Sequence, residues 1–305
     1  MVAPAPGKSP RKAASLPAPL ADFYSRPRPH WLVEDSLSAN RWTIQLEDPT
    51  LRRNALISIP FDVPVAPGIS LLDKSQWRDL LTAKLYIYLA LTGRNSFIRT
   101  STSLREEYAG FLTFLRWRNE RGIHKTNLLT KAWFSEFCES LTLDGLEGLL
   151  KTEVNALKFV TSARERGLSP PSQLSSKNSL SMNACARLIG LDSVHQLSPK
   201  ALEHFACWGK EHGLGFHTAL KRRLGQPVLK ARSVALDRYF RVWERLGRMH
   251  DSMGHDPINY RPFACRQDSI RLARSFGALR QRTRTIPAQQ ACFLIDRALR
   301  WVLFY

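Results

Sequence analysis

The sequence is poor in the residues that support a disulfide framework, a zinc site or a membrane span. It has five cysteines in 305 residues, an odd number at wide spacing and without a C-x-x-C pair. This usage is typical of reduced thiols and excludes a disulfide-stapled fold. No stretch of about 18 residues is both apolar and uncharged, and the N-terminus lacks the apolar segment of a secretory signal. We therefore expect a cytoplasmic protein without a membrane contact.

Signature motifs of common enzyme classes are also missing. The chain contains no G-x-x-x-x-G-K-[ST], G-x-G-x-x-G, H-E-x-x-H or G-x-S-x-G pattern. Two His-Asp pairs, at 250–251 and 255–256, could ligate a metal, but their spacing does not align on a helix, and Gly254 and Pro257 interrupt the segment. We interpret this segment as an exposed loop, and we expect no metal, no cofactor and no small-molecule substrate.

Acidic residues are scarce relative to basic ones. The chain has 26 Asp and Glu against 45 Lys and Arg, so that the net charge is +19 and the isoelectric point is about 10.2. A surplus of this size is typical of a protein that meets a polyanion, because each neutralised phosphate releases condensed counterions. Solubility, or a genome rich in arginine codons, is the alternative explanation. The charge therefore favours nucleic acid as the partner.

Hydropathy and turn residues divide the chain into five regions. Residues 1–30 hold seven of the 18 prolines and predict a disordered basic tail. Residues 31–72 predict an irregular lead-in with short strands, one of which places Trp42, Ile44 and Leu46 on the same face. The remaining regions are a helical domain at 73–167, a Pro- and Ser-rich linker at 168–180, and a second basic helical module at 181–305.

Residues 73–167 predict four short helices that form one mostly α domain. Residues 100–103 offer N-caps for the second helix, whose apolar residues recur at steps of three and four, and Thr130 caps the third. The fourth helix is predicted to run unbroken over 146–166, with an inward stripe of Leu150, Val154, Leu157 and Val160.

Residues 181–305 continue the helical pattern and hold much of the positive charge. Between positions 216 and 305 there are 18 basic and six acidic residues. Residues 182–191 resemble the first helix and turn of a helix-turn-helix, although the pattern is degenerate. Predicted helices cover 182–190, 199–213, 230–249, 266–278 and 287–304.

A polar ridge on the predicted fourth helix is the first candidate DNA contact. Lys151, Asn155 and Lys158 fall at i, i+4 and i+7, so that two ammonium groups and an amide share one side of the helix. Such a ridge could meet phosphates and a base edge in a major groove. A solvated helix face without a partner is the alternative.

Arginines around the predicted second helix and its loops are the second candidate. The free backbone N–H groups at a helix start attract anions, although some of these arginines will only pair with Glu106, Glu107 and Glu120. Two arginines of the second module complete the set. These candidates are Arg94, Arg99, Arg116, Arg118, Arg121, Lys125, Arg282 and Arg284.

The apolar spacing of the helical block carries a resemblance to a known family. The residues that carry it are Thr102, Leu104, Tyr108, Phe111, Phe114, Trp117, Leu129, Phe137, Thr152, Val154, Leu157 and Val160. This run is similar to the SAM-like core-binding domain of phage-type tyrosine recombinases (integrases). The resemblance covers 73–167 and, more loosely, 230–305. It implies a protein that grips double-stranded DNA during recombination or integration, together with other recombinase protomers.

The catalytic residues that this resemblance implies are not found. A tyrosine attacks the phosphodiester in that family, helped by an H-x-x-R motif and further cations. None of the eight histidines here has arginine three positions later. Tyr305 belongs to the last predicted helix and has no catalytic partners before it, so we assign no catalytic residue.

We therefore expect the nucleoid-associated, DNA-binding N-terminal portion of an integrase-like protein, separated from its catalytic domain by truncation or a frameshift. A non-enzymatic DNA- or RNA-binding regulator or accessory factor is the first alternative. An active strand-transfer enzyme with Tyr305 as its nucleophile is the second alternative.

Overall fold

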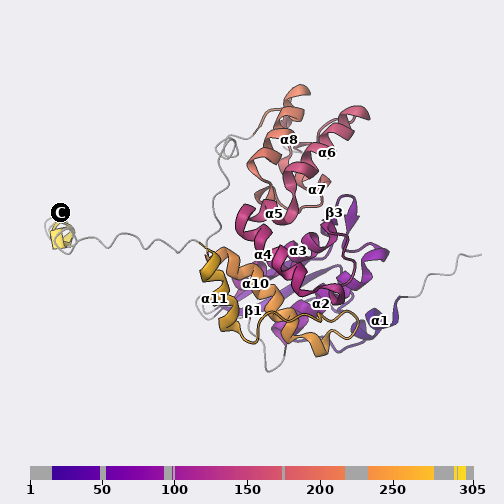
Figure 1. Cartoon of the computed structure of the whole chain (residues 1–305), viewed down its shortest axis with the longest axis vertical. Helices are drawn as coiled ribbons and strands as arrows, with labels where there is room; N and C mark the ends of the chain where they lie inside the picture. The colour runs from indigo at the N-terminus through magenta and orange to yellow at the C-terminus, as the bar shows by residue number, and fades with distance from the viewer. Residues whose placement is uncertain are drawn as a thin grey trace, which may run out of the picture.

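Helices dominate the computed structural model, which describes residues 16–48, 53–92, 98, 100–173, 176–216, 233–277, 292–293 and 295–299 (Figure 1). The mostly α fold expected from the sequence is thereby confirmed. None of the helices in these ranges is long and apolar enough to cross a bilayer. The helices are α1 (Ala18–Tyr24), α2 (Trp77–Leu91), α3 (Ser101–Glu120), α4 (Lys131–Asp144), α5 (Leu146–Leu150), α6 (Thr152–Glu165), α7 (Met182–Leu188), α8 (Pro199–Glu211), α10 (Ser233–Arg248) and α11 (Arg266–Phe276).

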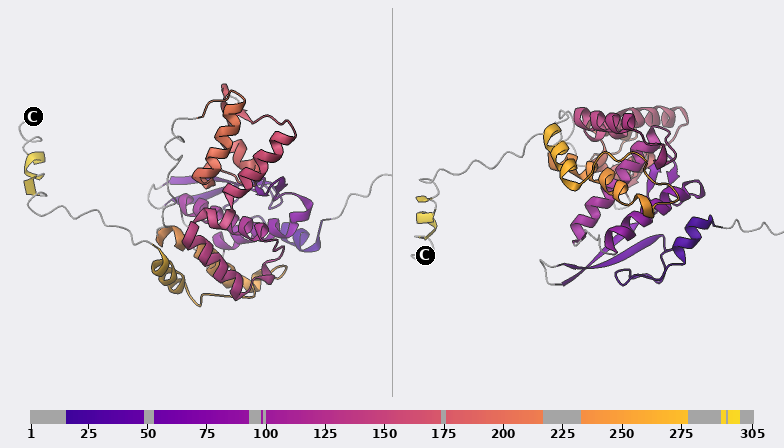
Figure 2. Two further views of the ribbon diagram at one scale, coloured as in Figure 1. Left: turned by 45° about the horizontal axis from the view of Figure 1, so that its top comes forward. Right: turned by 60° about the horizontal axis from the view of Figure 1, so that its bottom comes forward.

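Short strands pair into three small antiparallel ladders. In the largest, β1 pairs with β2 so that Trp42 faces Ile59 and Ile44 faces Ile57. Trp42, Ile44 and Leu46 are all buried, which confirms the predicted strand face. The right-hand view of Figure 2 shows this hairpin along one side of the helices. The strands are β1 (Arg41–Asp48), β2 (Arg53–Pro60), β3 (Pro64–Ala66), β4 (Ile69–Ser70), β5 (Ser172–Gln173) and β6 (Ser176–Leu180), and the short 3-10 turns are η1 (Lys74–Gln76), η2 (Thr126–Leu128), η3 (Val194–Gln196) and η4 (His250–Ser252).

Helix α3 is the centre of the main body. The Thr100 hydroxyl caps it by accepting a hydrogen bond from the Ser103 amide at 3.2 Å, as the sequence predicted. Its apolar stripe is buried beneath α2, β2, β3, α5 and α10. The rings of Trp117, Phe137 and Trp243 meet with centroids 4.9 to 5.9 Å apart, which ties α3 to α4 and α10.

The packing does not divide at the linker expected over 168–180. Helix α10 lies in the expected second module, yet it packs on α3, and Trp243 of α10 is fully buried there. Part of the expected linker forms the β5–β6 pair, and Leu180 is buried. Apolar spacing predicts that a helix has a buried face but does not identify the helix that covers it, which is why the module boundary could not be placed from sequence.

Helices α6, α7 and α8 form a lobe that projects from this body (Figures 1 and 2). Helices α6 and α8 run side by side in the same direction, because Glu153 and Lys200 pair near their starts while Arg164 and Glu211 pair near their ends. The ring of Phe159 packs against two aromatic rings of α8. The lobe therefore has a small core of its own.

The helix predicted over 146–166 is broken at Lys151. Helix α5 ends at Leu150, Lys151 adopts φ 46° and ψ 45°, and α6 begins at the next residue. Because a left-handed residue turns the chain, the apolar phase of α5 does not continue into α6. Leu150 and Val160 are buried as predicted, but Val154 and Leu157 are 45% and 47% exposed, contrary to the prediction.

The helices predicted in the second half are present as α7, α8, α10 and α11, with ends that differ by a few residues. Of the helix predicted over 287–304, residues 292–293 and 295–299 are helical, and the rest lies outside the described residues. The helix-turn-helix interpretation of residues 182–191 is wrong. Ten residues, which include η3, separate α7 from α8, whereas that motif joins its helices by a turn of about three or four residues.

Candidate nucleic-acid interface

One side of α6 packs into the lobe and the other faces solvent. Thr152, Ala156, Val160 and Ala163 recur at the helical period and are buried. The opposite side presents Lys151, Val154, Leu157, Lys158 and Thr161, all exposed. We call Lys151, Val154, Leu157 and Lys158 the α6 ridge.

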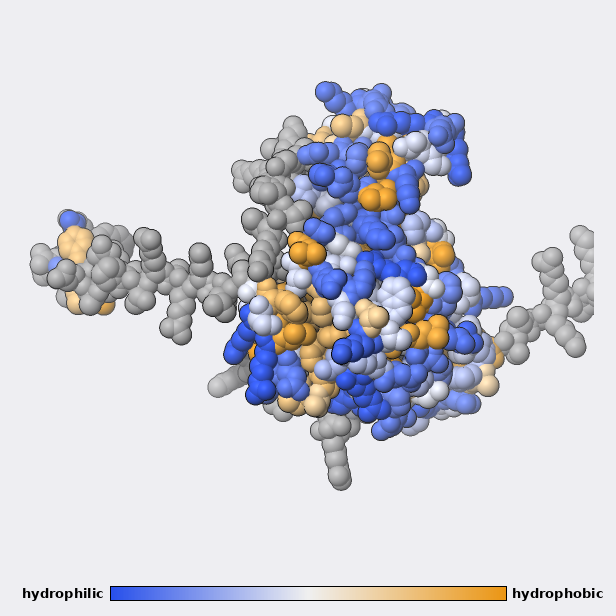
Figure 3. Space-filling view, viewed as in Figure 1, coloured by the Kyte–Doolittle hydropathy of each residue, from blue (hydrophilic) through white to orange (hydrophobic). Residues whose placement is uncertain are grey.

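The two lysines of the α6 ridge have no hydrogen-bond or ion-pair partner among the described residues. Arg166, Arg187 and Lys210 of the lobe are likewise exposed without a partner among the described residues. Two other cations of the lobe are paired, Arg164 with Glu211 and Lys200 with Glu153 at 3.2 Å. Figure 3 shows that the projecting lobe has a mainly hydrophilic surface interrupted by small apolar patches. The ridge thus offers two free ammonium groups beside two exposed aliphatic side chains.

Lys151 holds a backbone conformation that lysine disfavours. It is the only residue other than glycine with a positive φ in the described part of the chain. Its amide donates to the Glu147 carbonyl at 2.7 Å, and the Glu147 carboxylate accepts hydrogen bonds from the Thr152 hydroxyl and, at 2.8 Å, from the Glu153 amide. The left-handed region costs a residue with a Cβ about 1–2 kcal/mol relative to glycine. The local hydrogen bonds offset this strain.

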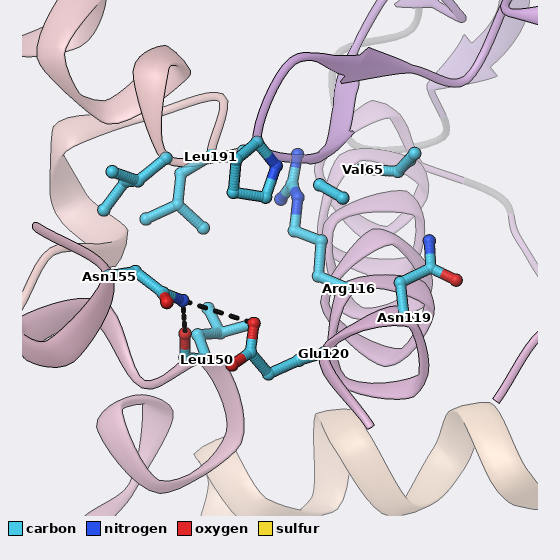
Figure 4. Close-up of a pocket in the computed structure, with 11 residues that line it drawn as sticks. Val65, Arg116, Asn119, Glu120, Leu150, Asn155 and Leu191 are labelled. Carbon is cyan, nitrogen blue, oxygen red and sulfur yellow. Dashed lines mark hydrogen bonds between the residues drawn. The ribbon is translucent and has the colours of Figure 1, made fainter. Parts of the chain in front are cut away.

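Asn155, the third member of the predicted ridge, does not face solvent with the lysines. Its side-chain amide donates to Glu120 and to the Leu150 carbonyl, both at 3.2 Å (Figure 4). These bonds tie the start of α6 to the end of α3 and to α5. Asn155 therefore connects the lobe to the body. This corrects the prediction that Asn155 contacts a base edge.

Arg116 is likewise removed from the predicted DNA-contact set. It is 4% exposed, and its guanidinium donates to Asp192 at 3.0 Å and twice to the Pro64 carbonyl, at 2.9 and 3.1 Å. Burial lowers the pKa of Arg116, while the Asp192 carboxylate acts in the opposite direction. A guanidinium can satisfy this many acceptors because it is a planar fork of five donors. Arg116 fixes β3 and the loop after α7 to α3.

Arg118 is fully buried and is also excluded as a DNA contact. It forms an ion pair with Asp79 of α2, donates to the Thr126 hydroxyl at 2.8 Å, and lies 3.7 Å from the Asp256 carboxylate. Asp256 in turn accepts the backbone N–H groups of Thr126 and Asn127 at 2.8 and 3.1 Å. This network fixes the segment after α10 to the centre of the body.

The same network corrects part of the interpretation of 250–257 as an exposed loop: Asp251, Ser252 and Gly254 are exposed, but Asp256 is not. Asp256 is 2% exposed, and the His255 ring contacts the Thr82 hydroxyl at 2.8 Å. Burial lowers the pKa of His255. No group of three His, Cys, Asp or Glu side chains is placed to hold a metal ion within the described ranges.

Arg121 closes α3 by bonding inward. It pairs with Glu136 of α4 at 2.8 Å and donates to the carbonyls of Gly148 and Leu149 in α5. Lys125 is exposed, as a phosphate contact requires, and stays a candidate. The predicted contacts that lie outside the described residues are Arg94, Arg99, Arg282 and Arg284, and Tyr305 lies outside them as well.

A cavity of about 150 Å³ lies where the lobe meets the body. Asn155, Glu120 and Arg116 line it together with residues of the β3–β4 turn and the loop after α7 (Figure 4). Gly190 closes one side, because a Cβ there would lie 2.7 Å from the Ala66 carbonyl carbon. Asn155 bonds to Glu120 and to the Leu150 carbonyl, and Arg116 bonds to Pro64 and Asp192, so the cavity lies among contacts that connect the lobe to the body.

Sequence reasoning missed that arginines of α10 pair with two acids of α3, Glu106 and Glu107. Arg238 pairs with Glu106 at 3.0 Å, and Arg245 pairs with Glu107 at 2.5 Å. Tyr86 donates a hydrogen bond to Glu107 from the other side. The spacing of Arg238, Arg241, Arg245 and Arg248 along one helix was the available signal, since it predicts a basic face opposite acids as readily as a basic face opposite phosphates.

The charge surplus is not spread evenly along the chain. The segments outside the described residues contain 15 of the 45 basic residues and none of the 26 acidic ones. The described residues therefore hold 30 basic (45 − 15) and 26 acidic side chains. Because most of the cations near the centre of the body pair internally, the α6 ridge is the exposed unpaired cationic feature best placed on a projecting element.

No family model, curated protein or solved structure matches this chain.

Proposed function

We propose that this chain binds double-stranded DNA, as the nucleoid-associated DNA-binding part of a tyrosine-recombinase-like protein that acts in recombination or integration. The α6 ridge carries the proposal. It presents two ammonium groups without partners among the described residues, one on Lys158 of the 14-residue helix α6 and one on Lys151 directly before it, in a lobe that projects from the body. A solvent-facing helix of this kind fits the width of a major groove, and lysines at its edges meet the phosphates.

The charge distribution supports the same partner. Folded elements neutralise most of their own charge, and the remaining surplus lies in acid-free stretches of sequence between and beyond them. Such stretches contribute to affinity for a polyanion without regard to its base sequence. The recombination context rests on the resemblance of the helical block, α2 to α6, to a core-binding domain. The proposal assigns no strand-transfer chemistry to the chain.

A salt titration of the full chain on a duplex of about 30 base pairs tests the proposal. The logarithm of affinity should fall linearly with the logarithm of salt, by about 0.9 for each phosphate neutralised. Replacing both ridge lysines, Lys151→Ala with Lys158→Ala, should therefore flatten the slope by about 1.8. The matched control, Arg105→Ala with Arg274→Ala, removes two exposed cations from the body and should leave most of the slope.

Two results would contradict the proposal. One is a double ridge variant with the slope of the unmodified chain, which would remove α6 from the interface. The other is full displacement of the duplex by equimolar structured RNA, which would favour the RNA-binding alternative.

A further inference from the structure

The α6 ridge has two aliphatic side chains that the fold leaves exposed. Val154 and Leu157 are nearly half exposed, although the lobe buries its other large aliphatic residue on α6, Val160. They lie three residues apart and so share one side of the helix. Lys151 precedes them and Lys158 follows them. The apolar pair is therefore bracketed by two free cations.

The diameter of the helix that carries this ridge matches one groove of DNA. An α-helix with its side chains is about 10–12 Å across, and the major groove is about 12 Å wide. With α6 lying in that groove, Lys158 and Lys151, the residue directly before the helix, can each meet a phosphate while the side chains of Val154 and Leu157 point at base edges. In that groove the apolar group available to an aliphatic side chain is the 5-methyl of thymine.

We infer that α6 reads the major groove, with Val154 and Leu157 contacting thymine methyl groups while Lys151 and Lys158 hold flanking phosphates. This inference rests on the proposed function and adds base specificity to it. A protein partner fits the ridge less well. A stable protein interface buries about 800 Å² on each side and is depleted of lysine at its centre, whereas this ridge has two aliphatic residues between two lysines.

The backbone of Lys151 is an independent observation in favour of the ridge. Glycine would hold its left-handed conformation without strain. The chain instead places there a side chain whose only described role is to carry an unpaired charge. Strain at an exposed residue is explained if the ammonium group itself is needed.

The test compares thymine with uracil in the same duplex. The full chain first selects tight binders from a pool of random duplexes, and each selected duplex is then made with deoxyuridine in place of thymidine, which removes only the 5-methyl groups. We expect an affinity loss of about fourfold for each contacted methyl. The Val154→Ala, Leu157→Ala double variant should bind the two duplexes equally, with an unchanged salt slope. Leu143→Ala, at a more exposed leucine on α4, is the matched control and should keep the thymine preference.

The outcomes separate this inference from the function on which it rests. Duplex binding without any selected sequence, or a double variant that retains the thymine preference, would overturn base reading by the ridge and leave DNA binding intact. Failure to bind any duplex would overturn both. Thermal melting of the double variant should match the unmodified chain, because both side chains are largely exposed in the folded state.

Discussion

Helices α3 and α6 both carry basic residues beside an apolar stripe, yet they use them in opposite ways. Arg116 and Arg118 of α3 turn inward and bond to carboxylates and carbonyls, whereas Arg105 near the start of the helix is exposed. The lysines of α6 extend into solvent without partners among the described residues. A guanidinium satisfies several acceptors at once and tolerates burial, whereas an ammonium group is more strongly hydrated. Cationic residues near an apolar stripe therefore do not by themselves indicate a binding surface.

The largest loss of stability should come from replacing a buried arginine of α3. Arg118→Met removes the cation between Asp79 and Asp256 and leaves two buried carboxylates uncompensated. We expect the free energy of unfolding to fall by about 3–5 kcal/mol, measured by urea denaturation. Lys158→Ala on the exposed side should change it by less than about 0.5 kcal/mol. Similar losses for the two variants would contradict the contrast between the helices.

A buried lysine sharpens the comparison with the exposed lysines of α6. Lys84 of α2 is fully buried, donates to the carbonyls of Leu37 and Ala39 at 2.8 and 3.0 Å, and lies against the rings of Tyr24 and Phe61. No described carboxylate lies within ion-pair distance of it. Burial lowers the pKa of Lys84 from its ordinary value of 10.5 to about 7.

This pKa predicts the second-largest effect, a stability that depends on pH. The folded state releases the Lys84 proton near pH 7, while the unfolded chain keeps it until about pH 10.5, so that rising pH favours the folded state across this window. Stability relative to the Lys84→Met variant should rise by about 2 kcal/mol between pH 7 and pH 9, as measured by urea titrations at each pH. A constant difference between the two proteins would show that Lys84 keeps its ordinary pKa.

The local elements of this fold were predictable, and their partners were not. Alternation at Trp42, Ile44 and Leu46 predicted β1, and steps of three and four predicted α3, because both patterns depend on near neighbours in sequence. The partners of Arg118 lie 39 and 138 positions away, at Asp79 and Asp256. Spacing along one helix carries no information about such contacts.

Prediction from sequence spacing also failed in part at the candidate site, although the residues concerned lie close together in the chain. Lys151 and Lys158 were predicted on an exposed ridge and are exposed, but Asn155, predicted with them, bonds to Glu120 and to the Leu150 carbonyl. A residue other than glycine that adopts the left-handed conformation is difficult to recognise from the sequence. Its effect was to rotate Val154 and Leu157 from the expected core face to the solvent face.

A small stability effect of the opposite sign is expected at Lys151. Lys151→Gly relieves the left-handed strain, and glycine also gains freedom in the unfolded chain. We expect the free energy of unfolding to stay within about 1 kcal/mol of the unmodified value, with any change toward greater stability. A Tm scan checks this directly. A clear loss of stability would mean that the lysine side chain supports the fold.

The measurement that most directly tests the α6 ridge as the DNA contact is the salt dependence of duplex binding by the Lys151→Gly variant. This substitution keeps the fold while deleting one ammonium group of the ridge. The slope of log affinity against log salt should flatten by about 0.9 while Tm is unchanged or higher. A variant that melts like the unmodified chain and also keeps its full slope would contradict the assignment of the ridge to DNA.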